Sequence, residues 1–273
     1  MKQDSYRWAQ MQARKQFLAD RRSKVEEKYA AQWGHPIHGI QTPFVESFDS
    51  AGQAQLSSPP TDDDGNPLEE AHELPTSPHI LDHHLTKKEL DEAISLAEQL
   101  NRPRREENRV LADPVSEEDE VRAHEEHHRK AVAALERIVA LDNASQKSKT
   151  HANIRRCIET FGRHETDKTL RPKPRACGVE EVAKARRAGP DTGSSEVQIA
   201  ILTAKIRVLS KMYFEEHKGR KDRVNRRNLR LLLHRRQKLL KYMQKKERGS
   251  ERWTHMIEKL GLSPATWEKQ IEV

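Results

Sequence analysis

The sequence predicts an all-α protein, with a helical domain at the C-terminal end preceded by an extended, partly helical N-terminal extension. Apolar residues after position 191 recur at steps of three and four, the period of an amphipathic helix. No segment alternates apolar and polar residues for more than a few positions, so no strand is predicted. The chain is 34% hydrophobic, 5% aromatic and 34% charged, which is too little apolar material to pack 273 residues into one core.

The extension begins with a predicted helix and continues as a predicted linker. A helix is expected over residues 4–31 because large apolar side chains fall near one face, namely Trp8, Met11, Leu18, Val25 and Tyr29. Residues 33–84 have the composition of a linker, since prolines recur and an acidic TDDDGNP stretch lies among them.

Three helices are expected next. Thr86 and Glu89 have the spacing of a capping box, which predicts a helix from there to about Asn101. Ser116 is expected to cap a second helix that runs to about Leu141, with an acidic first turn suited to the helix dipole. A third helix is expected over residues 146–161 and ends at Gly162.

The C-terminal region is expected to form further helices after a basic, proline-broken segment at residues 163–178. One strongly amphipathic helix follows position 191, and a second contains the leucines between 229 and 240. Gly249 and Ser250 are expected to end that helix and cap a third, and Ser263-Pro264 begins a last short turn. The Ser195-x-x-Gln198 spacing also has the form of a capping box.

The distribution of charge points to a polyanionic partner. Residues 176–273 carry a net charge of +11, whereas residues 1–175 carry −4. Residues 205–248 hold 17 lysines and arginines but only four acidic residues. Like charges at this density repel one another unless phosphates compensate them, so this segment predicts RNA or DNA binding with steep salt dependence. A simple solvated basic face is the alternative.

Other classes of function find little support. The sequence contains no Walker loop, no Gly-x-Ser-x-Gly and no dinucleotide-binding glycine cluster. We therefore expect that the protein is not an enzyme and binds no cofactor. The sequence contains no long apolar run, so no membrane partner is predicted. Cys157 and Cys177 match no metal or redox spacing and are expected to be reduced thiols. Two histidine groups, His124/His127/His128 and His79/His83/His84, are more simply explained as solvated side chains than as metal ligands.

Several stretches resemble the bacterial-type small-subunit ribosomal protein fifteen family. DTGSSEVQIAILTAKI (191–206) resembles the opening of the family's second helix. NRRNL (225–229), RRQKLLKYM (235–243) and RWTHMIEKLGL (252–262) follow in the family's order and at nearly its spacing. The resemblance covers residues 191–262, and its DTGS-x-EVQ opening is highly specific.

This resemblance implies a four-helix module that binds a three-way junction of the small-subunit ribosomal RNA, supports subunit assembly and translation, and lies near the interface with the large subunit. Residues implied in the junction contact are Thr192, Gly193, Ser194, Gln198, Lys205, Arg236 and Tyr242. The resemblance also implies RNA contacts at the tip of a basic helical hairpin, from His217, Asp222, Asn225, Arg226 and Arg227. On the residues alone, 192–194 could be only a turn and helix cap, and Tyr242 could equally belong to the core.

The sequence departs from the family at this tip. One extra residue precedes His217, two more precede Lys221, and Asn225 replaces a usual serine. The family's first helix also has two candidates. CIETFGRHETD (157–167) resembles the text that normally joins DTGS directly, which implies an insertion of residues 168–190, and VEEVAKARR (179–187) is the competing candidate.

The long extension is typical of a mitochondrial member of the family. We expect an N-terminal extension over residues 1–144 that contacts neighbouring small-subunit proteins, an RNA-binding module over 145–273, and a location in the mitochondrial matrix, on the ribosome. No secretory signal is visible, and acidic residues near the N-terminus argue against an intact transit peptide. The alternatives are a free-standing RNA-binding regulator and a scaffold whose basic hairpin binds an acidic protein.

Overall fold

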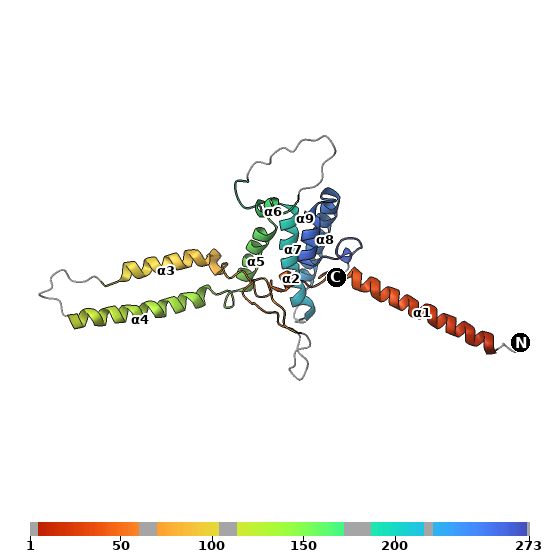
Figure 1. The fold of residues 1–273 in the computed structure, drawn as a ribbon, viewed down its shortest axis with the longest axis horizontal. Helices are drawn as coiled ribbons and strands as arrows, with labels where there is room; N and C mark the ends of the chain where they lie inside the picture. The colour runs from red at the N-terminus through yellow and green to blue at the C-terminus, as the bar shows by residue number, and fades with distance from the viewer. Residues whose placement is uncertain (1–4, 60–69, 104–113, 172–186, 216–220, 272–273) are drawn as a thin grey trace. The chain divides into compact units, whose positions relative to one another are not determined.

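The fold is all-α, as the sequence predicts. The structure is a computed structural model, and it describes residues 5–59, 70–103, 114–171, 187–215 and 221–271. Across these ranges it contains helices, with three isolated β-bridges and no strand (Figure 1). None of the helices in the described ranges is both long and apolar enough to cross a membrane.

Contacts divide the chain into two compact units, and each unit combines parts of the extension with parts of the C-terminal region. The first unit comprises Met1–Thr42, Leu170–Glu180 and Leu209–Val273. The second comprises Pro43–Thr169 and Glu181–Val208. These units do not divide at residue 144, and the proposed boundary there remains a prediction about function.

The first unit is built on two helices of the C-terminal region, α8 (Arg223–Lys246) and α9 (Glu251–Leu260). Their buried side chains recur at helical spacing and form an apolar core of Leu229, Leu233, Leu240, Met243, Met256 and Leu260. Ser250 caps α9 through its side-chain oxygen, as predicted. A π turn (Lys211–Glu215) and a short 3-10 turn (Pro264–Thr266) complete the described elements of this region.

The extension packs directly against α9 in this unit. Helix α1 (Ser5–Trp33) is followed by a tight turn, after which the Ile40 N–H donates to the Gly261 carbonyl at 2.7 Å. The Thr42 hydroxyl then donates to the Lys259 carbonyl at 2.8 Å. Gly261 ends α9 in the left-handed conformation (φ +61°), and a side chain there would collide with the Ile40 carbonyl. Glycine is therefore required both for the helix end and for the approach of the extension.

The second unit contains the remaining helices. Figure 1 shows α3 and α4 as a pair of long helices side by side, coloured yellow and yellow-green. The predicted capping box of Thr86 and Glu89 is present at the start of α3. The helices of this unit are α2 (Pro43–Glu46), α3 (Lys87–Asn101), α4 (Pro114–Val139), α5 (Gln146–Phe161), α6 (Arg163–Thr169) and, up to residue 208, α7 (Ser195–Ser210).

The described parts of the segment predicted to be a linker, residues 33–59 and 70–84, contribute instead to a folded core. Val45, Phe48, Ala51 and Ile80 are all at most 4% exposed. They pack around α5, where the buried Asn153 donates to the Phe48 carbonyl at 2.7 Å. Frequent prolines favoured the linker interpretation, but short apolar runs between the prolines supply enough buried surface to order the segment.

Arg156 on α5 holds this segment together. Its side chain is 2% exposed, and desolvation by burial lowers its pKa. The guanidinium donates to the Ser47 carbonyl and hydroxyl, the Pro75 carbonyl, the Ser77 hydroxyl and the Asn153 side chain, at 2.7–3.2 Å. It also lies over the Phe44 and Phe48 rings. A single buried cation therefore joins three separate stretches of chain.

Three further predictions about helices need correction. Helix α4 begins at Pro114, so Ser116 lies within its first turn and does not cap it. Residues 163–169, assigned from sequence to a basic, proline-broken segment, form α6. Helix α7 is not one-sided, because Ile199 and Ala200 are adjacent in sequence and both fully buried. A helix that is apolar on several sides is buried on several sides.

Candidate RNA-binding surfaces

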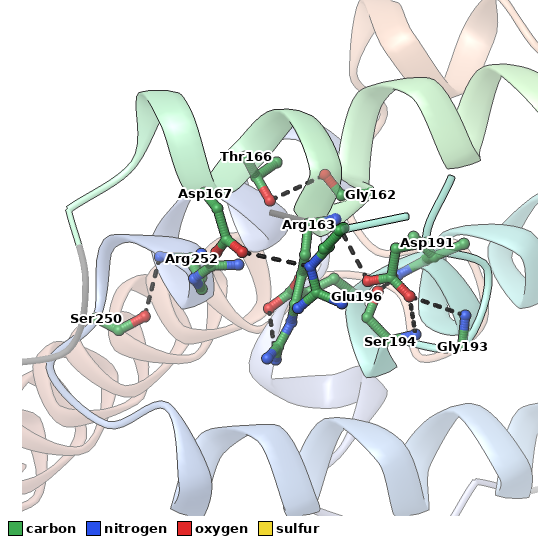
Figure 2. A network of polar contacts seen from close by, with 12 residues as sticks. Gly162, Arg163, Thr166, Asp167, Asp191, Gly193, Ser194, Glu196, Ser250 and Arg252 are labelled. Carbon is green, nitrogen blue, oxygen red and sulfur yellow. Dashed lines mark hydrogen bonds and ion pairs between the residues drawn. The ribbon is translucent and has the colours of Figure 1, made fainter. Parts of the chain in front are cut away.

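The loop before α7 is shaped by Asp191. Its Oδ1 accepts hydrogen bonds from the backbone N–H groups of Gly193 (3.1 Å) and Ser194 (3.2 Å). Its Oδ2 accepts from the Arg163 N–H at 3.4 Å, which ties the loop to the start of α6. Figure 2 shows these bonds converging on the carboxylate. Thr192 and Gly193 are left exposed at the outer edge of the loop, as a backbone contact with phosphate requires.

The helix start differs in detail from the predicted capping box. Helix α7 begins at Ser195, and the residue before it, Ser194, accepts from the Val197 N–H through its hydroxyl at 3.5 Å. Gln198 does not pair with Ser195, because its side-chain amide donates to the Thr192 carbonyl at 2.8 Å. Gln198 therefore braces the loop from the helix side and fixes the backbone of Thr192.

The charge of Asp191 is favoured by the fold. Burial raises the pKa of this carboxyl, but hydrogen bonds from Gly193, Arg163 and Ser194 outweigh burial, and the net pKa is lowered from 3.8. Asp191 is therefore ionised at neutral pH and acts as the acceptor around which the loop is wound.

Replacing Asp191 with alanine is expected to lower the free energy of unfolding by roughly 1–2 kcal/mol at pH 7, because three backbone N–H groups lose their acceptor. A lowered pKa stabilises the folded state above the unfolded-state pKa, and this contribution is lost as pH falls through the folded-state pKa. Urea denaturation measures the free energy of unfolding of the unchanged protein and of Asp191→Ala. The difference between the two should be constant from pH 7 to pH 5 and smaller at pH 3. An equal difference at all three pH values would contradict the assigned role.

A second surface begins at the start of α8. The Asp222 carboxylate caps this helix, accepting from the N–H groups of Val224 and Asn225 at 3.0 Å each. The Asn225 side-chain amide also donates to Asp222, at 2.7 Å. Both residues were predicted to contact RNA, and the structure assigns them first to each other. His217, predicted at the same tip, lies outside the described residues.

The exposed face of α8 is strongly basic. Its 24 residues include ten lysines and arginines and no acidic residue, and nine of the ten cations are exposed. Arg226 and Arg227, both predicted to contact RNA, belong to this exposed set. The exposed cations are Arg223, Arg226, Arg227, Arg230, Arg235, Lys238, Lys241, Lys245 and Lys246.

Arg236 is the exception on α8, because its side chain is completely buried. Its guanidinium donates to the Ile37 carbonyl at 2.7 Å, and desolvation lowers its pKa to about 10. Arg236 was predicted to continue the RNA-binding surface. In this structure the extension covers it, so Arg236 fixes residues 35–40 to α8 and does not face outward.

Two other predicted residues are accessible. Tyr242 is 50% exposed, and the Lys246 ammonium lies 5.2 Å from its ring centre. The interpretation of Tyr242 as a core residue is therefore wrong. Lys205 is exposed on α7, next to fully buried neighbours, and presents its charge to solvent.

Sequence analysis missed the ion pair that anchors α7. Arg207 donates from Nε and Nη2 to the two carboxylate oxygens of Asp49 at 2.9 and 3.0 Å. This bidentate pair connects the family-like helix to the extension. The two residues lie 158 positions apart, and nothing in the local pattern around either of them indicates the pairing.

The described residues contain no group of three or more metal-ligating side chains. Cys157 is buried and its pKa is raised to about 12, chiefly by desolvation, so its thiol is unreactive at neutral pH. Cys177 lies outside the described residues. Of the predicted histidine groups, His128 lies 3.8 Å from Glu98 and His79 lies 3.1 Å from Glu159.

Comparison with known proteins supports the resemblance. The family model of ribosomal protein S15 matches residues 179–263. This range contains the predicted core of 191–262 and begins at the first residue of the competing first-helix candidate. The small ribosomal subunit protein uS15m of Neurospora crassa is 57% identical over 273 residues, covering 99% of this chain and 85% of that relative.

Proposed function

The chain belongs to the ribosomal protein S15 family, and we propose that it binds its RNA through two surfaces, the Asp191–Ser194 loop and the exposed face of α8. It is a structural constituent of the small subunit of the mitochondrial ribosome and not an enzyme, and it works in the mitochondrial matrix. Its partners are the small-subunit ribosomal RNA and other ribosomal proteins.

The observation that carries this proposal is the contrast within α8. Nine cations are exposed on a helix that has no acidic residue, while Leu229, Leu233, Leu240 and Met243 are buried. The electrostatic free energy of such a face is unfavourable when the cations stand alone, because they repel one another, and becomes favourable when phosphates lie against it. Helices that present cations and polar groups suit double-stranded RNA, which is recognised mainly by its shape, phosphates and 2′-hydroxyls.

The loop before α7 supports a more local contact. Asp191 and Gln198 hold its backbone from two sides, so Thr192 and Gly193 are exposed without being free to change shape. Rigid exposed backbone at a helix start is a suitable partner for a phosphate. We assign this loop to the three-way junction that the family is expected to bind.

The α3–α4 pair is proposed to contact neighbouring proteins of the small subunit. Together the two helices hold eleven acidic and six basic residues. They also expose large apolar side chains, including Leu100 at 75% and Val115 at 65%. An acidic surface with exposed apolar residues suits a basic protein partner better than RNA. We also propose a contact with the large subunit, which the family resemblance implies without assigning it to particular residues.

Replacing Gly193 with valine is expected to weaken binding to the junction RNA roughly 3- to 10-fold, because a branched side chain holds a phosphate away from the loop backbone. A Cβ atom added at Gly193 meets no atom within 4 Å, so the fold should be unaffected. Gly189→Val is a matched control, since position 189 is equally open. Binding by filter retention and helicity by circular dichroism check both variants. Equal affinity of the two variants would remove the loop from the RNA interface.

A further inference from the structure

A cationic cavity lies where residues 80–84 of the extension meet α5, outside the residues that match the family. It has a volume of about 320 Å³ and lies between η1 (Asp82–His84) and the first turns of α5. Its charged and titratable lining residues are Asp82, His83, His84, Lys147, His151 and Arg155. The two helices nearby in sequence, α3 and α4, are acidic, whereas this cavity is lined by two cations, Lys147 and Arg155, and one carboxylate, Asp82.

The one carboxylate in the cavity is already engaged. Asp82 accepts from the His83 N–H at 2.7 Å and from the Ser148 side chain, and its own side chain is only 13% exposed. Burial raises its pKa, but these hydrogen bonds together with the nearby histidines lower it overall, so Asp82 stays ionised. Asp82 therefore shapes the wall. Arg155 is partly engaged as well, because its Nε lies 3.5 Å from the Glu159 carboxylate and its Nη1 donates to the His84 carbonyl. Lys147, the imidazoles and the remaining donors of the guanidinium are left to face a ligand.

The cavity wall is held in an unusual backbone conformation. His83 and His84 are consecutive, and both have positive φ, at 57° and 64°. Non-glycine residues rarely adopt this conformation, and two in succession require support from the surrounding structure. Arg155 supplies it by donating to the His84 carbonyl at 3.2 Å, while the His151 ring packs edge-on against the His84 ring. The strained turn brings both imidazoles beside α5.

The geometry points to a phosphate-binding site, and we propose that its ligand is a backbone phosphate of the small-subunit ribosomal RNA. Lys147 supplies a point charge, Arg155 supplies planar guanidinium donors, and three imidazoles can donate hydrogen bonds. Lys147, Ser148 and His151 lie in the first turns of α5, where the helix dipole also favours an anion. The chain thereby gains an RNA contact outside the residues that match the family. This inference rests on the proposed function.

The test compares two charge reversals on α5, one at a residue that lines the cavity and one at a residue that does not. The full chain, Lys147→Glu and Lys149→Glu are titrated with complete mitochondrial small-subunit ribosomal RNA at several salt concentrations. Lys149 is on the same helix but does not line the cavity, so it controls for net charge. We expect Lys147→Glu to bind roughly 3- to 10-fold more weakly than Lys149→Glu, with a salt slope shallower by about 0.7–0.9.

A second readout follows the Lys147 amine directly. In the unmodified full chain, Lys147 should react with an acylating reagent when free and be protected once the RNA is bound, whereas Lys130 on α4 should stay reactive. Identical affinity and slope for the two variants, or a Lys147 that stays reactive, would overturn the phosphate site alone. Failure of the unmodified chain to bind the RNA would instead contradict the proposed function.

Discussion

Replacing Arg156 with methionine is expected to lower the free energy of unfolding by roughly 3–5 kcal/mol, the largest stability effect predicted for this chain. Methionine keeps the apolar stem but removes every donor. The acceptors left without this partner in the core belong to Ser47, Pro75, Ser77 and Asn153. Urea denaturation measures the loss, and hydrogen exchange should show faster opening of residues 43–57 and of α5.

Lys149→Met is the control for this substitution, because it also replaces a cation with methionine on the same helix, at a partly exposed position. It should change the free energy of unfolding by less than about 0.5 kcal/mol. If the two variants were equally stable, the buried guanidinium would not hold the extension to α5, and the packing of residues 43–59 and 70–80 would need another cause.

Replacing Arg226 and Arg227 together with alanine is expected to weaken binding to the small-subunit ribosomal RNA roughly 10- to 100-fold. Both side chains are exposed on α8, so the fold should remain intact. Loss of two phosphate contacts should also make the dependence of log K on log salt shallower by about 1.4–1.8. Filter binding at three or more salt concentrations measures both quantities.

The matched control is the pair Arg129→Ala and Lys130→Ala on α4. These residues are also adjacent, cationic and exposed on a long helix. The control changes the net charge by the same amount, so a general effect of charge would weaken both proteins equally. Equal weakening would show that α8 is a nonspecific polyanion surface and not the face that contacts the RNA.

Local features of the fold were largely predictable from sequence. The capping box of Thr86 and Glu89, the end of α5 at Gly162 and the cap of α9 at Ser250 all depend on residues within a few positions of one another. Helix caps of this kind can be recognised from short sequence motifs. The basic face of α8 was predictable for the same reason, because charge on a single helix needs no knowledge of tertiary contacts.

Long-range contacts were not predictable. The buried Arg156 donates to residues about 80 and 110 positions away, and Arg236 is covered by a turn 199 residues before it. An arginine with apolar neighbours in sequence resembles any other surface arginine until the chain folds over it. The linker prediction was therefore wrong for residues 33–59 and 70–84, and the prediction that Arg236 is part of the exposed surface was wrong as well.

The candidate RNA-binding residues divide in the same way. Thr192, Gly193, Arg226 and Arg227 are exposed, as an RNA contact requires, because each lies in a loop or on a helix face with its own local pattern. Other candidates are engaged within the protein. Asp222 accepts hydrogen bonds from the backbone and the side chain of Asn225, and Gln198 donates to the Thr192 carbonyl. Their effect on RNA binding is expected to be indirect, through the shape of the surfaces that they support.

The most direct test of the account is the binding of the full chain to the three-way junction of the mitochondrial small-subunit ribosomal RNA. The junction and a scrambled junction of equal length and composition are titrated in parallel at several salt concentrations. We expect tight, salt-dependent binding that prefers the intact junction by at least about tenfold. Equal affinity for the two RNAs would contradict recognition of the junction and leave only a general attraction between α8 and phosphate.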